Sequence, residues 1–87
     1  MTPHHIMLAD GRRLAIREDA VAIVNLLAAP QIDARQVFAI GRRLFEVGGI
    51  EPLDAIIDVV ISQLGCDNAD ELVMIWTPVI AGEDLAA

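Results

Sequence analysis

Residues 33–65, DARQVFAIGRRLFEVGGIEPLDAIIDVVISQLG, decide the fold of this 87-residue chain. Asp33 is a good helix N-cap, because its carboxylate can accept hydrogen bonds from first-turn amides. The apolar residues that follow recur at three- and four-residue spacing, which is typical of an amphipathic helix. Gly48 and Gly49 supply the left-handed conformation that ends a helix, and Pro52 favours the start of the next one. The stretch therefore predicts helices over 33–48 and 52–64, joined by a sharp turn.

The second predicted helix is apolar around most of its circumference. Its apolar residues are Leu53, Ile56, Ile57, Val59, Val60, Ile61 and Leu64. Only Asp54, Asp58 and Ser62 draw a polar line along it, which leaves an apolar arc of roughly 200° when residues are spaced about 100° apart. Ile57 and Val60 lie in the middle of this arc. We therefore expect the helix to be central in its own fold or to form half of an interface.

Residues 5–16 predict a β-hairpin ahead of the helices. Asp10 and Gly11 form a dipeptide that favours a two-residue type I′ turn, and apolar residues flank it on both sides. With such a turn, Met7 pairs with Leu14. A two-stranded hairpin is marginally stable alone, so we expect it to pack on the helices or to gain another strand.

A further helix is expected over 20–29. Glu18 and Asp19 place negative charge at its start, where the helix dipole favours it, and Pro30 ends it. Asn25 is the one polar residue in this run, and we place it at the exposed edge of the helix.

The C-terminal segment fits two structures. Asn68 and Glu71 have the spacing of a capping box, which predicts a short helix from Ala69 to about Trp76. The same residues are rich in strand formers, and Pro78 disfavours helix just before it. The predicted fold is mostly α, a compact bundle of three to four short helices with an N-terminal β-hairpin. The alternative is an α+β fold in which a C-terminal strand joins the hairpin.

Composition predicts one domain that leaves part of its apolar surface exposed. We assign residues 1–82 to a single small domain and 83–87 to a frayed acidic tail. The chain is 55% hydrophobic, with a mean hydropathy of +0.53, whereas a domain of this size buries only roughly 60–65% of its unfolded surface. The apolar run 20–29 is far short of the roughly 20 residues that span a membrane. A single cysteine and no secretory signal predict a cytoplasmic protein with no membrane contact.

Charge differs between the two halves of the sequence. Residues 1–48 carry all six arginines against five acids, a net charge of +1. Residues 49–87 carry eight acids and no basic residue, and their net of −8 completes the formal charge of −7. This asymmetry predicts association with a second copy of the chain or with a basic partner. The alternative is that the charged residues form ordinary solvated faces.

No catalytic, cofactor or metal site is expected. His4, His5 and Cys66 do not have the spacing of any common zinc site, and the sequence has no phosphate-binding glycine loop or nucleophile elbow. Asp54 and Asp58 share a helical face, but no partner base accompanies them, so we interpret them as a solvated stripe. The chain is therefore not expected to be an enzyme.

The function predicted from these features is protein interaction. The chain should regulate a larger protein, basic or itself a transcription regulator, by occupying its surface, as an inhibitor, antiactivator, immunity protein or antitoxin does. Predicted interface residues are Phe38, Phe45, Val59, Ile61 and Trp76. One alternative is a DNA-binding regulator of the helix-turn-helix type, although its recognition helix, 52–64, would carry aspartates and no basic residue. Another is an accessory subunit of a larger assembly.

Overall fold

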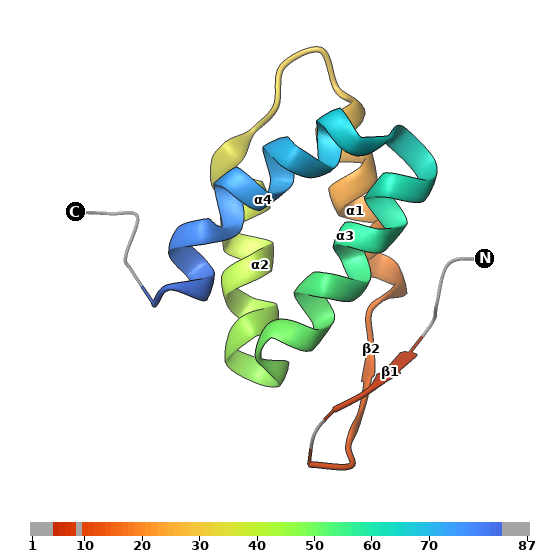
Figure 1. The fold of residues 1–87 in the computed structure, drawn as a ribbon, viewed down its shortest axis with the longest axis vertical. Helices are drawn as coiled ribbons and strands as arrows, with labels where there is room; N and C mark the ends of the chain where they lie inside the picture. Colours follow the sequence, from red (N-terminus) through yellow and green to blue (C-terminus); the bar gives the residue numbers. More distant parts are fainter. Residues whose placement is uncertain (1–4, 9, 83–87) are drawn as a thin grey trace.

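A two-stranded hairpin followed by four helices makes up the described part of the chain (Figure 1). The structure is a computed structural model and describes residues 5–8 and 10–82. Its elements are β1 (His5–Met7), β2 (Arg13–Ala15), α1 (Arg17–Ala28), α2 (Ala34–Gly48), α3 (Ile50–Leu64) and α4 (Cys66–Ile80). The predicted mostly-α bundle with an N-terminal hairpin is confirmed. The predicted acidic tail, 83–87, and His4 lie outside the described residues.

The hairpin pairs one residue out of the predicted register. Leu14 pairs with Ile6, whereas Met7 pairs with Arg13. A type I′ turn needs positive φ at both central residues, but among the described residues only glycines have positive φ, and in this turn that residue is Gly11 at 88°. The backbone N–H of Leu8 donates to the Arg12 carbonyl at 2.8 Å, which closes a three-residue loop instead. The shift turns Ile6 and Leu8 toward the helices, on the same side as Leu14 and Ile16, and leaves Met7 62% exposed.

The first two helices begin where their charges and caps predict. Glu18 and Asp19 lie in the first turn of α1, which ends at Ala28, just before Pro30, and Asn25 lies on its exposed side as predicted. At the start of α2, the Asp33 carboxylate accepts a hydrogen bond from the Gln36 backbone N–H at 3.3 Å. This interaction satisfies one of the amides that an isolated helix start leaves unpaired.

Gly49 separates α2 from α3, as the glycine pair predicted. Its φ is 71°, and its N–H donates to the Phe45 carbonyl at 2.8 Å. The second helix begins at Ile50, two residues before the predicted start, so Pro52 lies inside its first turn. Proline is tolerated there because the missing N–H would have no partner within the helix.

Three helices surround α3 and bury most of its apolar arc. It contacts α1, α2 and α4, and Leu53, Ile56, Val59 and Val60 are buried among them. Ile57 is only half-buried. The centre of the buried face is thus rotated away from the predicted position of Ile57. The expectation that this helix is central to its own fold is confirmed.

Helix α4 is longer than predicted, and the strand alternative is wrong. It runs from Cys66 to Ile80 and includes Pro78. Its buried residues are Ala69, Leu72, Trp76 and Val79. Their three- and four-residue spacing matches a helix, so packing outweighs the strand propensity of individual residues. The Thr77 hydroxyl donates to the Val73 carbonyl at 2.7 Å, in the turn just before the proline.

Trp76 joins α4 to α2 at the centre of the core. The indole is fully buried, and its Nε1–H donates to the backbone carbonyl of Val37 at 2.8 Å. Gly41 presents its bare backbone to the same ring. This close approach of α4 to α2 requires a residue without a side chain on α2.

Candidate functional site

Most of the residues predicted to form an interface are part of the core. Phe38, Val59 and Trp76 are buried and Phe45 is half-buried, whereas Ile61 is 43% exposed. The expectation that the first three remain on the surface is wrong, because α2, α3 and α4 use them to pack against one another. Of the five predicted residues, Ile61 is the most exposed.

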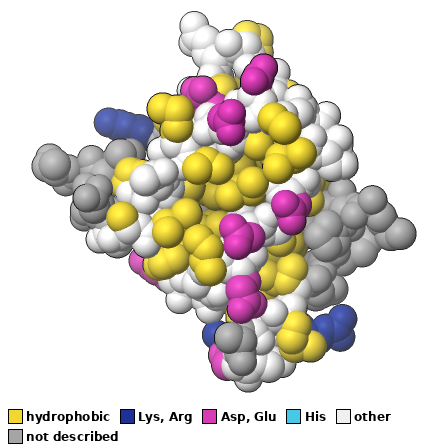
Figure 2. All heavy atoms as spheres, viewed as in Figure 1, with side chains coloured by type: hydrophobic (Ala, Val, Ile, Leu, Met, Phe, Trp, Pro, Cys, Tyr) yellow, Lys and Arg dark blue, Asp and Glu magenta, His cyan; other side chains and the backbone are white. Residues whose placement is uncertain are grey.

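Exposed apolar side chains instead gather on α3 and α4. They are Ile50 and Ile61 on α3 and Val73, Met74 and Ile80 on α4. Met74 is 73% exposed, the largest value among the exposed hydrophobic residues of the described chain. Figure 2 shows hydrophobic side chains collected across the face that α3 and α4 form in Figure 1. Met74 was not among the interface residues predicted from the sequence. The exposed side of α4 can be identified only once the whole segment is known to be helical.

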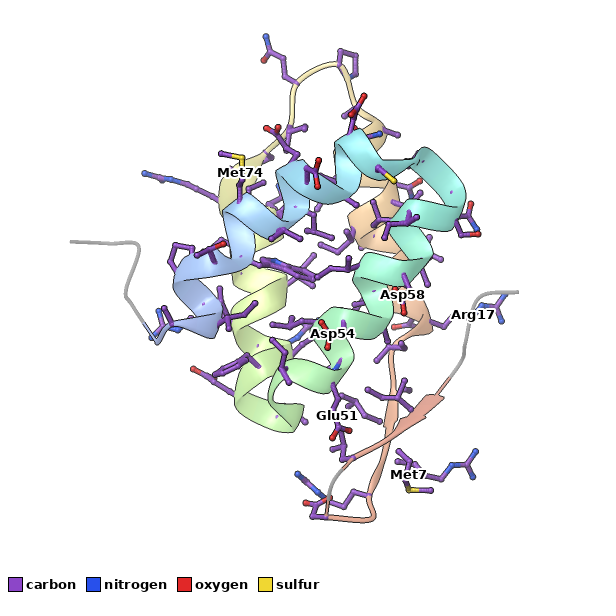
Figure 3. All side chains as sticks on the ribbon, in the orientation of Figure 1. Met7, Arg17, Glu51, Asp54, Asp58 and Met74 are labelled. Carbon is purple, nitrogen blue, oxygen red and sulfur yellow. The ribbon has the colours of Figure 1, made fainter. Side chains whose placement is uncertain are left out.

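Six exposed acidic residues lie on the same two helices. Glu51, Asp54 and Asp58 belong to α3, and Asp67, Asp70 and Glu71 belong to α4. Figure 3 shows the three α3 carboxylates in a row along the near side of the helix. No lysine or arginine follows Arg43 in the sequence, so these helices contain no basic side chain.

Helical spacing places the apolar and acidic side chains on one side of each helix. Ile61 follows Asp58 by three residues and Asp54 by seven, and Met74 follows Asp70 by four. Figure 3 shows Met74 on α4 and Asp54 and Asp58 on α3 in a view down the shortest axis of a molecule that measures 37 × 35 × 18 Å. We call this surface the α3–α4 face. It is formed by Ile61 and Met74 with the six acidic residues above.

The ion pairs of the described residues lie elsewhere. Arg12 pairs with Asp10 at 2.6 Å and also donates to the Val47 carbonyl at 3.0 Å. Arg43 pairs with Asp19, which ties α2 to α1. Glu46 pairs with Arg42 at 3.5 Å. Within residues 5–8 and 10–82, therefore, none of the six carboxylates of the α3–α4 face has a cationic partner.

The other surface features give little support to catalysis or small-molecule binding. A pocket of about 200 Å³ lies between α1 and α3, lined by Ala20, Val21, Val24, Asn25, Val59 and Gln63. It contains no titratable group and is smaller than the roughly 300–1,000 Å³ that ligand pockets occupy. Residues 5–8 and 10–82 also contain no group of three or more His, Cys, Asp or Glu side chains that could hold a metal ion.

The remaining observations concern Asp10, Cys66 and the length of the helices. The backbone N–H and guanidinium of Arg12 hold the pKa of the Asp10 carboxyl below its usual value, which stabilises the hairpin turn. Cys66 is exposed, with a free thiol. No helix in the described part of the chain is long and apolar enough to cross a membrane.

Comparison with known proteins does not identify a relative. No protein-family model, curated protein or solved structure matches this chain. The function must therefore be inferred from the α3–α4 face.

Proposed function

We propose that this chain is a small acidic protein-interaction module that regulates a larger protein by occupying its surface. The supporting observation is the α3–α4 face, where Ile61 and Met74 remain exposed between unpaired carboxylates. Large exposed apolar side chains that cluster on one face usually mark a binding site on a soluble protein. Inhibitors, antiactivators, immunity proteins and antitoxins act in this way, since blocking a surface requires no chemistry.

The two kinds of side chain on the face have different roles in this proposal. Burial of Met74 and Ile61 supplies affinity, because a fully buried side chain of this size contributes about 1.5–3 kcal/mol. The carboxylates attract a complementary partner from a distance and raise the association rate more than the affinity. The apolar contacts should therefore control dissociation, and the acids should control association and its dependence on salt.

DNA binding is the less favoured alternative. Helices α2 and α3 meet at Gly49 with the outline of a helix-turn-helix, and α3 would be the recognition helix. Glu51, Asp54 and Asp58 would then face the phosphates, which carry the same charge. An electrophoretic shift assay at low salt should detect no complex between the chain and duplex DNA, and a salt-dependent shift would favour the alternative.

Affinity capture tests the proposal. The immobilised full chain should retain one protein in stoichiometric amount from the native lysate, and the Ile61→Asp/Met74→Asp double variant should not retain it. The matched control is Met7→Asp/Val21→Asp, because Met7 is 62% and Val21 50% exposed outside the face. This control should retain the protein. Circular dichroism of both variants should match the wild type.

The activity of the captured protein also distinguishes a regulator from an accessory subunit. Adding the purified chain should change the activity of a regulated partner, and the Ile61→Asp/Met74→Asp variant should not. A partner whose activity is the same with and without the chain would favour an accessory subunit. Equal capture by the face variant and the control, or no capture by the wild type, would refute the proposed interaction.

A further inference from the structure

We propose that the segment that covers the α3–α4 face is a basic amphipathic helix of the partner protein. This inference rests on the proposed function and names the chemistry of its partner. The face combines an apolar surface with acidic side chains and has no basic residue. An occupant must therefore offer apolar side chains and positive charge together.

The arrangement of charge on the face determines the sign of the charge that the bound segment must carry. Figure 2 shows Asp and Glu side chains along α3 and near the start of α4, with hydrophobic side chains between them. Lys and Arg side chains appear only at the margins of this view. Opposed like charges at an interface cost free energy and slow association. An acidic segment is thus disfavoured, and a neutral one would leave the carboxylates desolvated without a partner.

The shape of the face favours a helix as the occupant. Helices α3 and α4 are consecutive, have 15 residues each and pack against each other, so the surface between them is elongated. Ile57 and Ile75 on these helices are half-buried, and Ile61 and Met74 are exposed. A helix with apolar residues at i, i+3, i+4 and i+7 presents one stripe to such a surface, and basic residues on its flanks would reach the carboxylates. About 15 residues would match the roughly 22 Å length of α3 or α4.

Met74 suits this mode of binding. Its side chain is unbranched, with three rotatable bonds and a polarisable sulfur, so it can adapt to apolar side chains of different shape. It is also among the most exposed apolar groups on the described chain. Figure 3 places it on α4, across the face from Asp54 and Asp58 on α3. A helix lying between them can contact both.

A second copy of the chain fits the face less well. A two-fold symmetric dimer through this surface would bring the six acids of one copy against the six of the other. The formal charge of −7 adds further repulsion between copies. Two of the arginines that could neutralise it, Arg12 and Arg43, are already paired with Asp10 and Asp19 of their own chain. A basic partner avoids both difficulties.

Three synthetic peptides of equal length test the inference by fluorescence anisotropy. The first is a helical 18-residue peptide with leucine at i, i+3, i+4 and i+7 and lysine on both flanks. The second has the same composition in scrambled order, and the third has glutamate in place of lysine. The first peptide should bind the full chain in a 1:1 complex, at least tenfold more tightly than the other two.

Matched variants locate the binding site and separate the contribution of the apolar side chains from that of the carboxylates. Ile61→Ser/Met74→Ser should weaken binding of the first peptide at least tenfold, whereas Met7→Ser/Val21→Ser should not change it. Asp54→Asn/Asp58→Asn should reduce both the affinity and its dependence on salt. Glu18→Gln/Glu46→Gln removes the same charge outside the face and should have a smaller effect on both.

Several results would overturn the inference. Equal binding of the scrambled peptide would indicate non-specific attraction to the net charge, and equal binding of the glutamate peptide would exclude recognition of basic residues. Sedimentation of the wild type as a dimer that Ile61→Ser/Met74→Ser dissociates would make a second copy the occupant. If affinity capture identifies a regulated partner whose contact segment is neutral or acidic, this inference fails but the proposed function stands. Selective peptide binding without a captured partner would support the chemistry of the face and count against the regulatory function.

Discussion

The packing of Trp76 against Gly41 allows the sharpest test of the fold. A methyl group added at Gly41 would place its Cβ 2.6 Å from both Cδ1 and Cε2 of the indole, well inside contact distance. The ring cannot move without cost, because it is fully buried and its Nε1–H donates to the Val37 carbonyl at 2.8 Å. Gly41→Ala should therefore push α4 away from α2 or displace the indole.

The expected cost follows from three contributions. Overpacking in a core typically costs about 1–3 kcal/mol. If the ring shifts enough to break the Nε1–H hydrogen bond, the unpaired buried groups cost about 1–3 kcal/mol more. Alanine favours a helix interior over glycine by about 1 kcal/mol, which partly offsets these terms. We expect Gly41→Ala to lower the free energy of unfolding by about 3 kcal/mol, a large share of the roughly 4–13 kcal/mol typical of a chain this long.

A double-mutant cycle isolates the steric effect. Trp76 is the single tryptophan, so its fluorescence reports directly on the core, and circular dichroism serves for variants that lack it. Unfolding free energies come from urea titrations of the wild type, Gly41→Ala, Trp76→Leu and the double variant. In the Trp76→Leu background, Gly41→Ala should be neutral or slightly stabilising, since leucine is smaller and flexible. An equal loss in both backgrounds, or a stabilising effect in the wild type, would refute this account of the α2–α4 contact.

Three further predictions concern the core, the turn between α2 and α3, and the hairpin. Ile56→Ala should lower the free energy of unfolding by about 2–5 kcal/mol, and Asp58→Ala by less than about 0.5 kcal/mol. A urea titration in which Asp58→Ala is the more destabilising variant would contradict the assigned faces of α3. Gly49→Ala should lower the free energy of unfolding by about 1–2 kcal/mol, because φ is 71° at this position. A variant that unfolds at the same temperature as the wild type would exclude that strain. Because folding lowers the pKa of Asp10, the stabilising effect of this carboxylate is present above the ordinary aspartate pKa of 3.8 and is lost as the pH falls through the folded pKa. The amide of Arg12 should therefore exchange with solvent faster, relative to the intrinsic rate, at low pH than at neutral pH, and Asp10→Asn should remove that difference.

Local features of the sequence were sufficient to predict the start of α2 and the break after it. Asp33 caps its own helix through a residue three positions away, and Gly49 ends that helix through its own φ. Both effects depend on neighbours in the chain rather than on distant contacts. The acidic character of the α3–α4 face was also readable, since no basic residue occurs after Arg43. These features need no knowledge of how the helices pack.

The exposed part of the candidate site could not be predicted in the same way. The apolar arc of α3 is wider than one neighbour can cover, and the side that stays exposed depends on where α1, α2 and α4 lie. Contact with α1 buries Val59, and Ile61 is left at the surface. Phe38 and Trp76 look equally suited to an interface by residue type, but both are buried in the core, where Trp76 packs against Gly41 of α2.

By itself, the sequence determined the first three helices and their order, the glycine turn between α2 and α3 and the acidity of the C-terminal half, because periodicity, capping and charge act over a few residues. Only the tertiary structure decided the hairpin register, the extent of α4 and the membership of the α3–α4 face. In the hairpin, a single residue with positive φ, Gly11, selects a three-residue loop, which turns the other side of β1 to the core while Leu14 of β2 still faces it. In α4, burial of Leu72, Trp76 and Val79 against the other helices keeps a segment rich in strand formers helical, past Pro78. Burial is a property of the packed chain, and it therefore also decides which apolar side chains are left for a partner.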